Sequence, residues 1–319
     1  MKKIGVLTSG GDCSGMNAAI RSVVRTALSK GLEVYGIRQG FIGLLDGLIK
    51  PMDSRSVSGI VQRAGTILHT ARCEEFKFDR GQEQAVKTIQ DFGLDGLVVI
   101  GGNGTMAGAL ALHNKGVPVV GIPGSIDNDL YGTDMSVGAD TALNTTVSMI
   151  DIIRDTASSH DRAFIIEVMG RDSGYLALVS AVASGAEAAI IPEVPFDLDA
   201  IATHLFERYK AGKTNSIVIV AEGASSAYTI ERKLKNKIGY ETRISVLGHI
   251  QRGGATTVFD RLMASKFGHN AVEGLLHGKF GVMTALHNSQ YMYVALEDTV
   301  LKKKKINSKL LDLAVDLSS

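Results

Sequence analysis

Two loops carry the residues of this chain whose types and spacing best suit chemistry. The glycine-rich segment 101–105 (GGNGT) follows the apolar run 97–100, and the acidic segment 127–129 (DND) follows a second apolar run at 118–123. Glycine-rich turns let backbone N–H groups approach an anion. Paired carboxylates can hold a magnesium ion and accept a proton from an attacking hydroxyl group. Together the two loops predict a phosphoryl-transfer site that binds magnesium.

A third loop, residues 9–15, has the same strand, glycine and helix order, because it lies between an apolar run at 3–8 and a helical pattern at 16–30. This order favours an anion site at a helix N-terminus. For each glycine loop alone, a tight turn without a ligand is the alternative, and for the acidic loop it is an Asx turn that caps a helix. The Walker pattern is absent, because Glu207 stands where the glycine before Gly212 would be required.

Five arginines stand near predicted strand ends or glycine turns: Arg72, Arg162, Arg171, Arg243 and Arg252. Arginine is well suited to bidentate phosphate recognition. We interpret the five as neighbours on loops at one edge of a sheet, where they would form a site for an anionic substrate. A surface ion pair is the alternative for any one of them. A second basic pair, Arg21 and Arg25, shares one helix face, which the pattern alone describes as solvated.

Apolar runs typical of strands alternate with helical patterns along the chain. Strands are predicted at 3–8, 33–38, 96–101, 117–123, 163–168, 188–192, 215–222 and 243–248. Helices are predicted at 16–30, 81–92, 105–115, 139–158, 174–184, 197–211 and 257–277. Strands that are apolar on both faces and separated by helices predict an α/β fold with a parallel sheet covered on both sides. Ligands of such sheets bind at the carboxyl ends of the strands.

Bulk properties bound the class of protein. A length of 319 residues predicts two lobes. The net charge is +1, and the lysine run 302–305 more than accounts for it, so no basic field suggests nucleic acid. We interpret that run as a solvated connector, with a polyanion contact as the alternative. The leucine-rich pattern at 310–317 has helical spacing and predicts a docked tail helix.

The remaining bulk signals concern the compartment. Cys13 and Cys73 are too few for a disulfide scaffold, which favours a reducing cytoplasm. The N-terminal apolar run is too short for a secretion signal, and the longest apolar stretch, 176–191, falls short of a membrane span.

Eight stretches occur in a familiar order: LTSGGDCSGMNAAIR, TARCEEF, VVIGGNGT, IPGSIDND, IRDTASSH, EVMGR, VAEG and VLGHIQRGG. Through them the chain resembles the bacterial ATP-dependent 6-phosphofructokinases from residue 1 to about residue 290. The resemblance implies a two-lobed, Rossmann-like, three-layer αβα fold. Residues 1–138 and 251–301 would form a larger nucleotide-binding lobe, and 139–250 and 302–319 a smaller sugar-phosphate-binding lobe. It also implies transfer of the γ-phosphoryl group of ATP to O1 of fructose 6-phosphate, with Mg²⁺, in a cytoplasmic homotetramer under ADP or phosphoenolpyruvate control.

The resemblance further implies a role for each matching residue. Catalysis would involve Asp127, as base for the sugar hydroxyl, with Arg72, Ser125 and Arg171. ATP would contact Gly11, Arg72, Cys73, Gly102, Asn103, Gly104, Thr105 and Gly108, and the metal would be held by Asn103 and Asp129. The sugar phosphate would contact Ser125, Asp127, Met169, Gly170, Arg171, Glu222, His249 and Arg252, with Arg162 and Arg243 from a neighbouring subunit. The effector would contact Arg21, Arg25, Arg154, Gly185, Glu187 and Lys213.

Asn103 is the main departure from the family pattern, which has aspartate at this position. The amide keeps a carbonyl oxygen but lacks the charge, so we expect weaker magnesium affinity and lower turnover. Gly59 and Ala211 replace charged residues near the expected effector and would weaken its control. Phe41 and Phe76 are candidates either for adenine contacts or for the core.

Three functions stay open at this stage. The leading one is an ATP-dependent kinase of fructose 6-phosphate. The second uses pyrophosphate as donor, and Gly104 argues against it, because pyrophosphate-using relatives carry an acidic side chain there that crowds out the α-phosphate. The third is a catalytically weakened paralogue that binds nucleotide or sugar phosphate as a regulatory subunit, a hypothesis that Asn103 motivates.

Overall fold

The computed structural model describes residues 1–159 and 161–318. His160, which ends the IRDTASSH stretch, and Ser319, the last residue of the predicted smaller lobe, lie outside the described residues. The chain divides into two compact units, Met1–Thr141 with Arg252–Lys304, and Ala142–Gln251 with Lys305–Ser319. Within the described ranges, no helix is long and apolar enough to cross a membrane.

The first unit contains a mixed sheet in the order β11-β10-β5-β4-β1-β2-β3. Its parallel strands are β1 (Lys3–Thr8), β2 (Glu33–Ile37), β4 (Gly96–Gly101), β5 (Val119–Pro123) and β10 (Val282–His287). The edge strands β3 (Ile49–Met52) and β11 (Gln290–Ala295) pair antiparallel with their neighbours. The predicted parallel sheet is therefore correct for the centre only. The sequence analysis missed three strands of this sheet: β3, β10 and β11. The edge strands β3 and β11 are partly exposed and lack the continuous apolar run of a central strand. β10 is buried at three positions only, and one of these is the polar Thr284.

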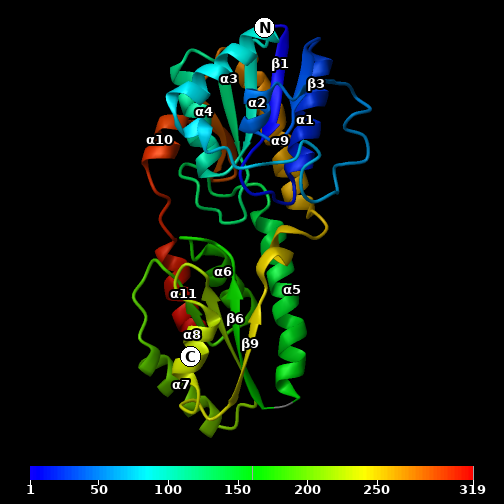
Figure 1. Ribbon diagram of the computed structural model, residues 1–319. Coiled ribbons are helices and arrows are strands. Elements are labelled where there is room, and N and C mark those ends of the chain that lie inside the picture. The colour runs from blue at the N-terminus through cyan, green and yellow to red at the C-terminus, as the bar shows by residue number, and fades with distance from the viewer. Residues whose placement is uncertain (160, 319) are drawn as a thin grey trace. The chain divides into compact units, whose positions relative to one another are not determined.

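Helices cover both faces of this sheet (Figure 1). They are α1 (Met16–Ser29), α2 (Phe41–Asp46), α3 (Asp79–Asp91), α4 (Asn103–Asn114), α9 (Val258–Leu276) and α10 (Leu296–Leu301), with a 3-10 turn η1 (Glu75–Lys77). α1 packs along α9, and α3 packs against α2 and α4. β4 and β5 are buried along their whole length, so the loops that follow them extend from the most rigid part of the unit.

The second unit has a fully parallel sheet in the order β7-β8-β6-β9. The strands are β6 (Arg162–Val168), β7 (Ala188–Ile190), β8 (Ser216–Ala221) and β9 (Glu241–Val246). The helices are α5 (Ala139–Ser158), which begins in the first unit, α6 (Tyr175–Ser184), α7 (Leu198–Lys210), α8 (Ala227–Leu234) and α11 (Ser308–Ser318), with a 3-10 turn η2 (Gly248–Arg252). α11 packs on α6 and β7, which confirms the predicted docked tail helix.

One buried carboxylate joins the N-terminal ends of α5 and α9. Asp260, in the first turn of α9, accepts hydrogen bonds from the Gly138 N–H at 2.9 Å, the Thr141 N–H at 2.8 Å and the Thr141 hydroxyl at 2.6 Å. Its side chain is fully buried, and this burial outweighs the hydrogen bonds, so the pKa of Asp260 rises to about 6.

This pKa makes a prediction about stability. Because the pKa of Asp260 is higher in the folded state than its ordinary 3.8, the native state binds more protons between about pH 4 and pH 6. The contribution of Asp260 to stability is therefore present at low pH and is lost as the pH rises through about 6. In urea unfolding across this window, Asp260→Asn should show a flatter pH dependence than the native chain. Asp91→Asn, at an exposed position, is the control, and an unchanged slope in Asp260→Asn would contradict the assignment.

Candidate active site

Three loops meet at the carboxyl ends of β1, β4 and β5. The Thr105 hydroxyl donates a hydrogen bond to the Ser9 carbonyl at 3.0 Å, and the Gly124 N–H donates to the Gly101 carbonyl at 2.9 Å. A Cβ atom on Gly101 would clash with the Ser9 carbonyl oxygen, so this approach requires a residue without a side chain. The loops that sequence reasoning selected for an anion and a metal therefore lie together at one edge of the sheet.

The acidic loop is shaped by Asn128, which stands between the two aspartates. Its φ of +49° is in the left-handed region, which asparagine adopts more readily than most residues. Its side chain is 2% exposed, accepts from the Ser136 N–H at 2.9 Å and donates to the Asp134 carbonyl at 3.0 Å. Sequence reasoning gave Asn128 no role of its own, although an asparagine at a turn was the available signal.

Asp127 lies in the same loop and is 6% exposed. Its backbone N–H donates to the Ser125 hydroxyl at 3.2 Å. Ser125 is in turn tied into the loop, because its carbonyl accepts from the Ser136 hydroxyl at 2.7 Å. A buried carboxylate held by a hydrogen-bonded loop is suited to accept a proton in a fixed geometry.

Asn103, the first residue of α4, contacts the other end of the acidic loop. Its Nδ2 donates a 2.6 Å hydrogen bond to Oδ2 of Asp129. An ionised carboxylate only accepts hydrogen bonds, which fixes the amide with its nitrogen toward Asp129 and its oxygen away from that bond. If residue 103 were an aspartate, its negative charge would repel that of Asp129 at this contact.

These two side chains form a small set of hard oxygen donors. Magnesium is commonly held by one or two carboxylates together with substrate phosphates rather than by a complete protein cage. Among the described residues, no group of three or more histidine, cysteine, aspartate or glutamate side chains could hold a metal ion. Asp129 and Asn103 therefore fit a magnesium ion that arrives with phosphate, and they supply one charge where two aspartates would supply two.

Two glycines expected to contact the nucleotide, Gly104 and Gly108, differ in how much free space lies beside them. A Cβ on Gly104 would have no atom within 4 Å, so the space beside this residue is open. A Cβ on Gly108 would clash with the Phe41 ring, which stacks on Phe76 with ring centroids 4.1 Å apart. Both phenylalanines are buried in the core of the first unit, so the structure supports the core interpretation of these rings.

Further expected nucleotide contacts are Gly11, on the loop 9–15, and Arg72 and Cys73, just before η1. A Cβ on Gly11 would clash with the guanidinium group of Arg252, which lies 3.7 Å from Asp12. Arg72 is exposed, and Cys73 is partly buried, which raises the pKa of its thiol. Arg252, expected at the sugar phosphate, and Gly11, expected at the nucleotide, are thus neighbours.

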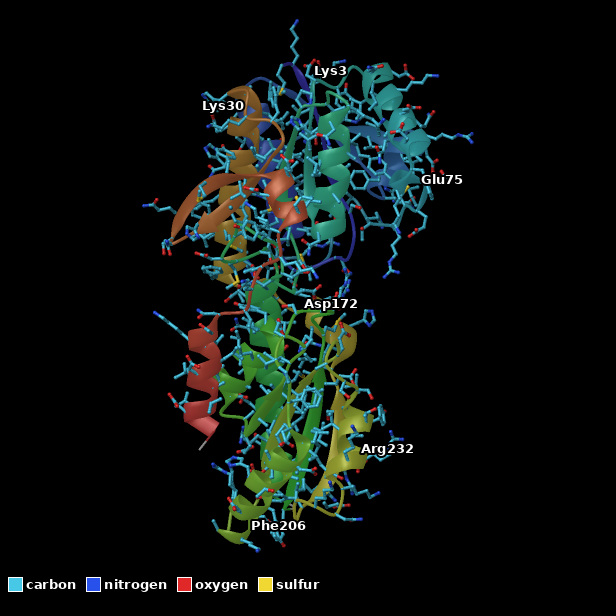
Figure 2. All side chains as sticks on the ribbon, turned by 90° about the vertical axis from the view of Figure 1, so that its left-hand side faces the viewer. Lys3, Lys30, Glu75, Asp172, Phe206 and Arg232 are labelled. Atoms are coloured by element: carbon cyan, nitrogen blue, oxygen red, sulfur yellow. The ribbon has the colours of Figure 1, made fainter. Side chains whose placement is uncertain are left out.

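In the second unit, the loop after β6 is held by Glu222, which follows β8. The Glu222 carboxylate accepts from the N–H groups of Gly170 at 3.2 Å and Arg171 at 2.9 Å. Arg171 has a φ of +52°, which an arginine adopts only under external constraint. Asp172 marks this loop in Figure 2. His249 lies on η2, after β9, so Met169, Gly170, Arg171, Glu222 and His249 all follow the carboxyl ends of parallel strands.

Arg162 and Arg243 do not lie at the carboxyl ends of their strands, which corrects the interpretation of the five arginines as one cluster. Arg162 is the first residue of β6, and six further residues of extended strand, about 20 Å, separate it from Val168 at the other end. Arg243, near the start of β9, lies beside it, and both arginines pair with Glu241. The hydrogen bond from Arg162 is the main cause that lowers the pKa of Glu241. Because these arginines lie at the amino end of their strands, the same chain cannot bring Arg162 and Arg171 to one phosphate.

Four residues expected at an effector site cluster around β7. Arg154 donates to the carbonyl oxygens of Ser184 at 2.8 Å and Gly185 at 3.1 Å. Glu187 is 4% exposed and pairs with Lys213. Arg21 and Arg25 lie on α1 of the first unit.

The fold and the site define an α/β protein with glycine loops and a buried carboxylate, Asp127, at the carboxyl ends of its parallel strands. Residues 3–275 match the family described as phosphofructokinase, and the chain belongs to this family. It is 53% identical over 319 residues to the ATP-dependent 6-phosphofructokinase of Thermotoga neapolitana and 51% identical over 318 residues to that of Halalkalibacterium halodurans, with 100% of each chain covered.

Solved structures confirm the fold. Pichia pastoris phosphofructokinase in the T-state superposes with a TM-score of 0.90 and 34% identity over 99% of this chain, which spans 36% of that longer chain. A pyrophosphate-dependent phosphofructokinase from Marinobacter aquaeolei has a TM-score of 0.85 at 21% identity, covering 100% of this chain and 92% of that one, and so shares the fold alone.

The crowding between the loops 9–15 and 101–105 makes a prediction about stability. Gly101→Ala should lower the free energy of unfolding by about 1–3 kcal/mol, because the new methyl group must displace backbone. Gly104→Ala, in the first turn of α4, is the matched control and should be neutral or stabilising by about 0.5–1 kcal/mol, since its Cβ meets open space at a helical position. Urea unfolding measures both, and equal effects would contradict the assigned approach.

Proposed function

We propose that this chain transfers the γ-phosphoryl group of ATP to the O1 hydroxyl of fructose 6-phosphate, giving fructose 1,6-bisphosphate in the committed step of glycolysis. The observation that carries the proposal is 53% identity over the whole chain to an ATP-dependent 6-phosphofructokinase. A second support is the buried Asp127, on a loop that is hydrogen-bonded to the glycine loop at Gly101. A cytoplasmic location accords with two free cysteines, Cys13 and Cys73.

The proposed reaction is an in-line displacement. The O1 oxygen of the sugar forms a bond to the γ-phosphorus, the bond from phosphorus to the β–γ bridging oxygen breaks, and ADP leaves. The O1 proton passes to the carboxylate of Asp127. Because the transition state is loose, the base contributes mainly through position, which the Ser125 hydroxyl supports by accepting the Asp127 N–H. Arg72 and Arg171 are the proposed sources of positive charge for the transferring group.

Magnesium is the proposed metal, with Asp129 and Asn103 as its protein ligands. When bound, it would neutralise negative charge on the nucleotide phosphates. Asp129 supplies the anionic oxygen, and Asn103 supplies a neutral one whose nitrogen is committed to Asp129. This arrangement supports weaker metal binding than two carboxylates would give, without removing the site.

ATP is the proposed donor rather than pyrophosphate. The open space beside Gly104 supports this choice, because a nucleotide needs room past its β-phosphate. The regulatory-subunit hypothesis rests on the Asn103–Asp129 contact, and the retained Asp127 opposes it.

The sugar-phosphate and effector sites also belong to the proposal. Met169, Gly170, Arg171, Glu222, His249 and Arg252 would bind fructose 6-phosphate. Arg162 and Arg243 would complete that site from a neighbouring subunit of a homotetramer, and their position at the amino end of β6 and β9 supports a role outside their own chain's site. The cluster of Arg154, Gly185, Glu187 and Lys213, with Arg21 and Arg25, would bind ADP or phosphoenolpyruvate.

A magnesium titration of fructose 6-phosphate phosphorylation tests the function and the metal site together. We expect turnover in the native chain at raised magnesium, and half-maximal velocity of Asn103→Asp at roughly tenfold lower magnesium, a difference of about 1.4 kcal/mol. The added carboxylate supplies the charge that magnesium prefers. Calorimetry of magnesium-dependent ADP binding to both proteins gives a second readout that does not require turnover.

Asn103→Gln is the control, because it keeps the amide but changes its reach. Equal magnesium dependence of the native chain and Asn103→Asp would contradict the weakened metal site. A folded native chain that binds fructose 6-phosphate but is silent at every magnesium concentration would overturn the kinase and leave the regulatory subunit.

A further inference from the structure

The lysine run 302–305 is not uniform in its surroundings. Three of its members are exposed, whereas Lys304 is partly buried. The Nζ atom of Lys304 donates a 3.0 Å hydrogen bond to the carbonyl oxygen of Asp134, which stands 170 positions earlier in the chain. The interpretation of the run as a solvated connector is therefore wrong at Lys304.

The carbonyl that Lys304 contacts belongs to the acidic loop. The same Asp134 oxygen accepts the Nδ2 of Asn128 at 3.0 Å, so the lysine and the asparagine share one acceptor. Asn128 links Asp127 to Asp129, and its other side-chain atom accepts the Ser136 N–H. Lys304 and Asn128, the residue between the two aspartates, are thus both hydrogen-bonded to the Asp134 carbonyl.

Charge adds to this contact. Burial lowers the pKa of Lys304 to about 8, and the carboxylates of Asp134 and Asp129 act in the opposite direction, so both lie close enough to favour the ammonium form. Asp134 also accepts the Asn288 N–H at 2.7 Å and faces His287 at 3.2 Å. Lys304 therefore places a positive charge at the Asp134 carbonyl, the oxygen that Asn128 also contacts.

We propose that Lys304 is a positioning residue of the phosphoryl-transfer site, which holds the loop of Asp127 and Asp129 through a charged hydrogen bond to the Asp134 carbonyl. Asp129 on this loop is the proposed ligand of the magnesium that accompanies ATP, so the anchoring is expected to affect ATP more than the sugar phosphate. Lys304 is the last residue of the first unit, so the tail contributes to the site before it continues to α11.

The inference rests on the proposed function, and kinetics test it through Lys304→Met. We expect kcat to fall about tenfold, which corresponds to about 1.4 kcal/mol, with KM for ATP raised and KM for fructose 6-phosphate nearly unchanged. Lys304→Arg, which keeps the charge and a donor, should recover most of kcat. Lys303→Met, at an exposed position next in the run, is the matched control and should behave as the native chain.

A second measurement does not depend on turnover. Hydrogen exchange at the amides of Ser136 and Val137 reports on the acidic loop, because these groups donate to Asn128 and to the Pro123 carbonyl. We expect exchange there to be at least about fivefold faster in Lys304→Met than in Lys303→Met. If the native chain shows no turnover, the proposed function fails, and this readout still tests the anchoring of the loop.

The inference is overturned if Lys304→Met matches Lys303→Met in kcat and in exchange, or if it loses only thermal stability. Lys304→Gln covers the case in which the methionine variant does not fold, since glutamine keeps a donor and removes the charge. Its kcat should lie between those of the methionine and arginine variants. A native kcat in Lys304→Gln would show that the charge has no role and would also overturn the inference.

Discussion

The close backbone approach between the carboxyl ends of β1 and β4 is the constraint on which the first unit depends. Gly101 has to lack a side chain there, because the Ser9 carbonyl occupies the space of a Cβ. The Thr105 hydroxyl closes the same contact, so a residue expected to contact nucleotide also joins the two loops. Because Gly124 is hydrogen-bonded to Gly101, the start of the acidic loop is held beside the same contact.

Asn103 shows how this geometry affects charge. At 2.6 Å from Asp129, a second carboxylate would require a cation to hold the contact, whereas the amide donates a hydrogen bond and needs none. The loops can therefore keep their arrangement without metal. The amide at position 103 thus has two consequences. It supplies less negative charge to the proposed metal site than an aspartate would, and it holds the Asp129 end of the acidic loop by a hydrogen bond.

The two ends of β6 divide the arginines between two tasks. β6 has seven residues and begins at Arg162. The loop at its carboxyl end is therefore farther from Arg162 than an arginine side chain can reach. Arg171 belongs to the loop that Glu222 holds, and Arg162 belongs with Arg243 around Glu241. Arg162 and Arg171 are both expected to bind fructose 6-phosphate. Because they lie at opposite ends of β6, they would bind different molecules of that sugar phosphate.

The sequence by itself determined most of the parallel strands, most helices and the three loops of the site, because these depend on local apolar patterns and glycine turns. It also indicated Asp127, Asp129 and Asn103, whose residue types already limit their chemistry. It did not predict β10, whose buried stretch is short and contains Thr284. The antiparallel edges, the pairing of Arg162 and Arg243 with Glu241 and the contact of Lys304 with the Asp134 carbonyl were decided only by tertiary structure. Each of these depends on contacts between distant segments, and a contact such as Lys304 with Asp134 leaves no periodic or compositional signal in either segment.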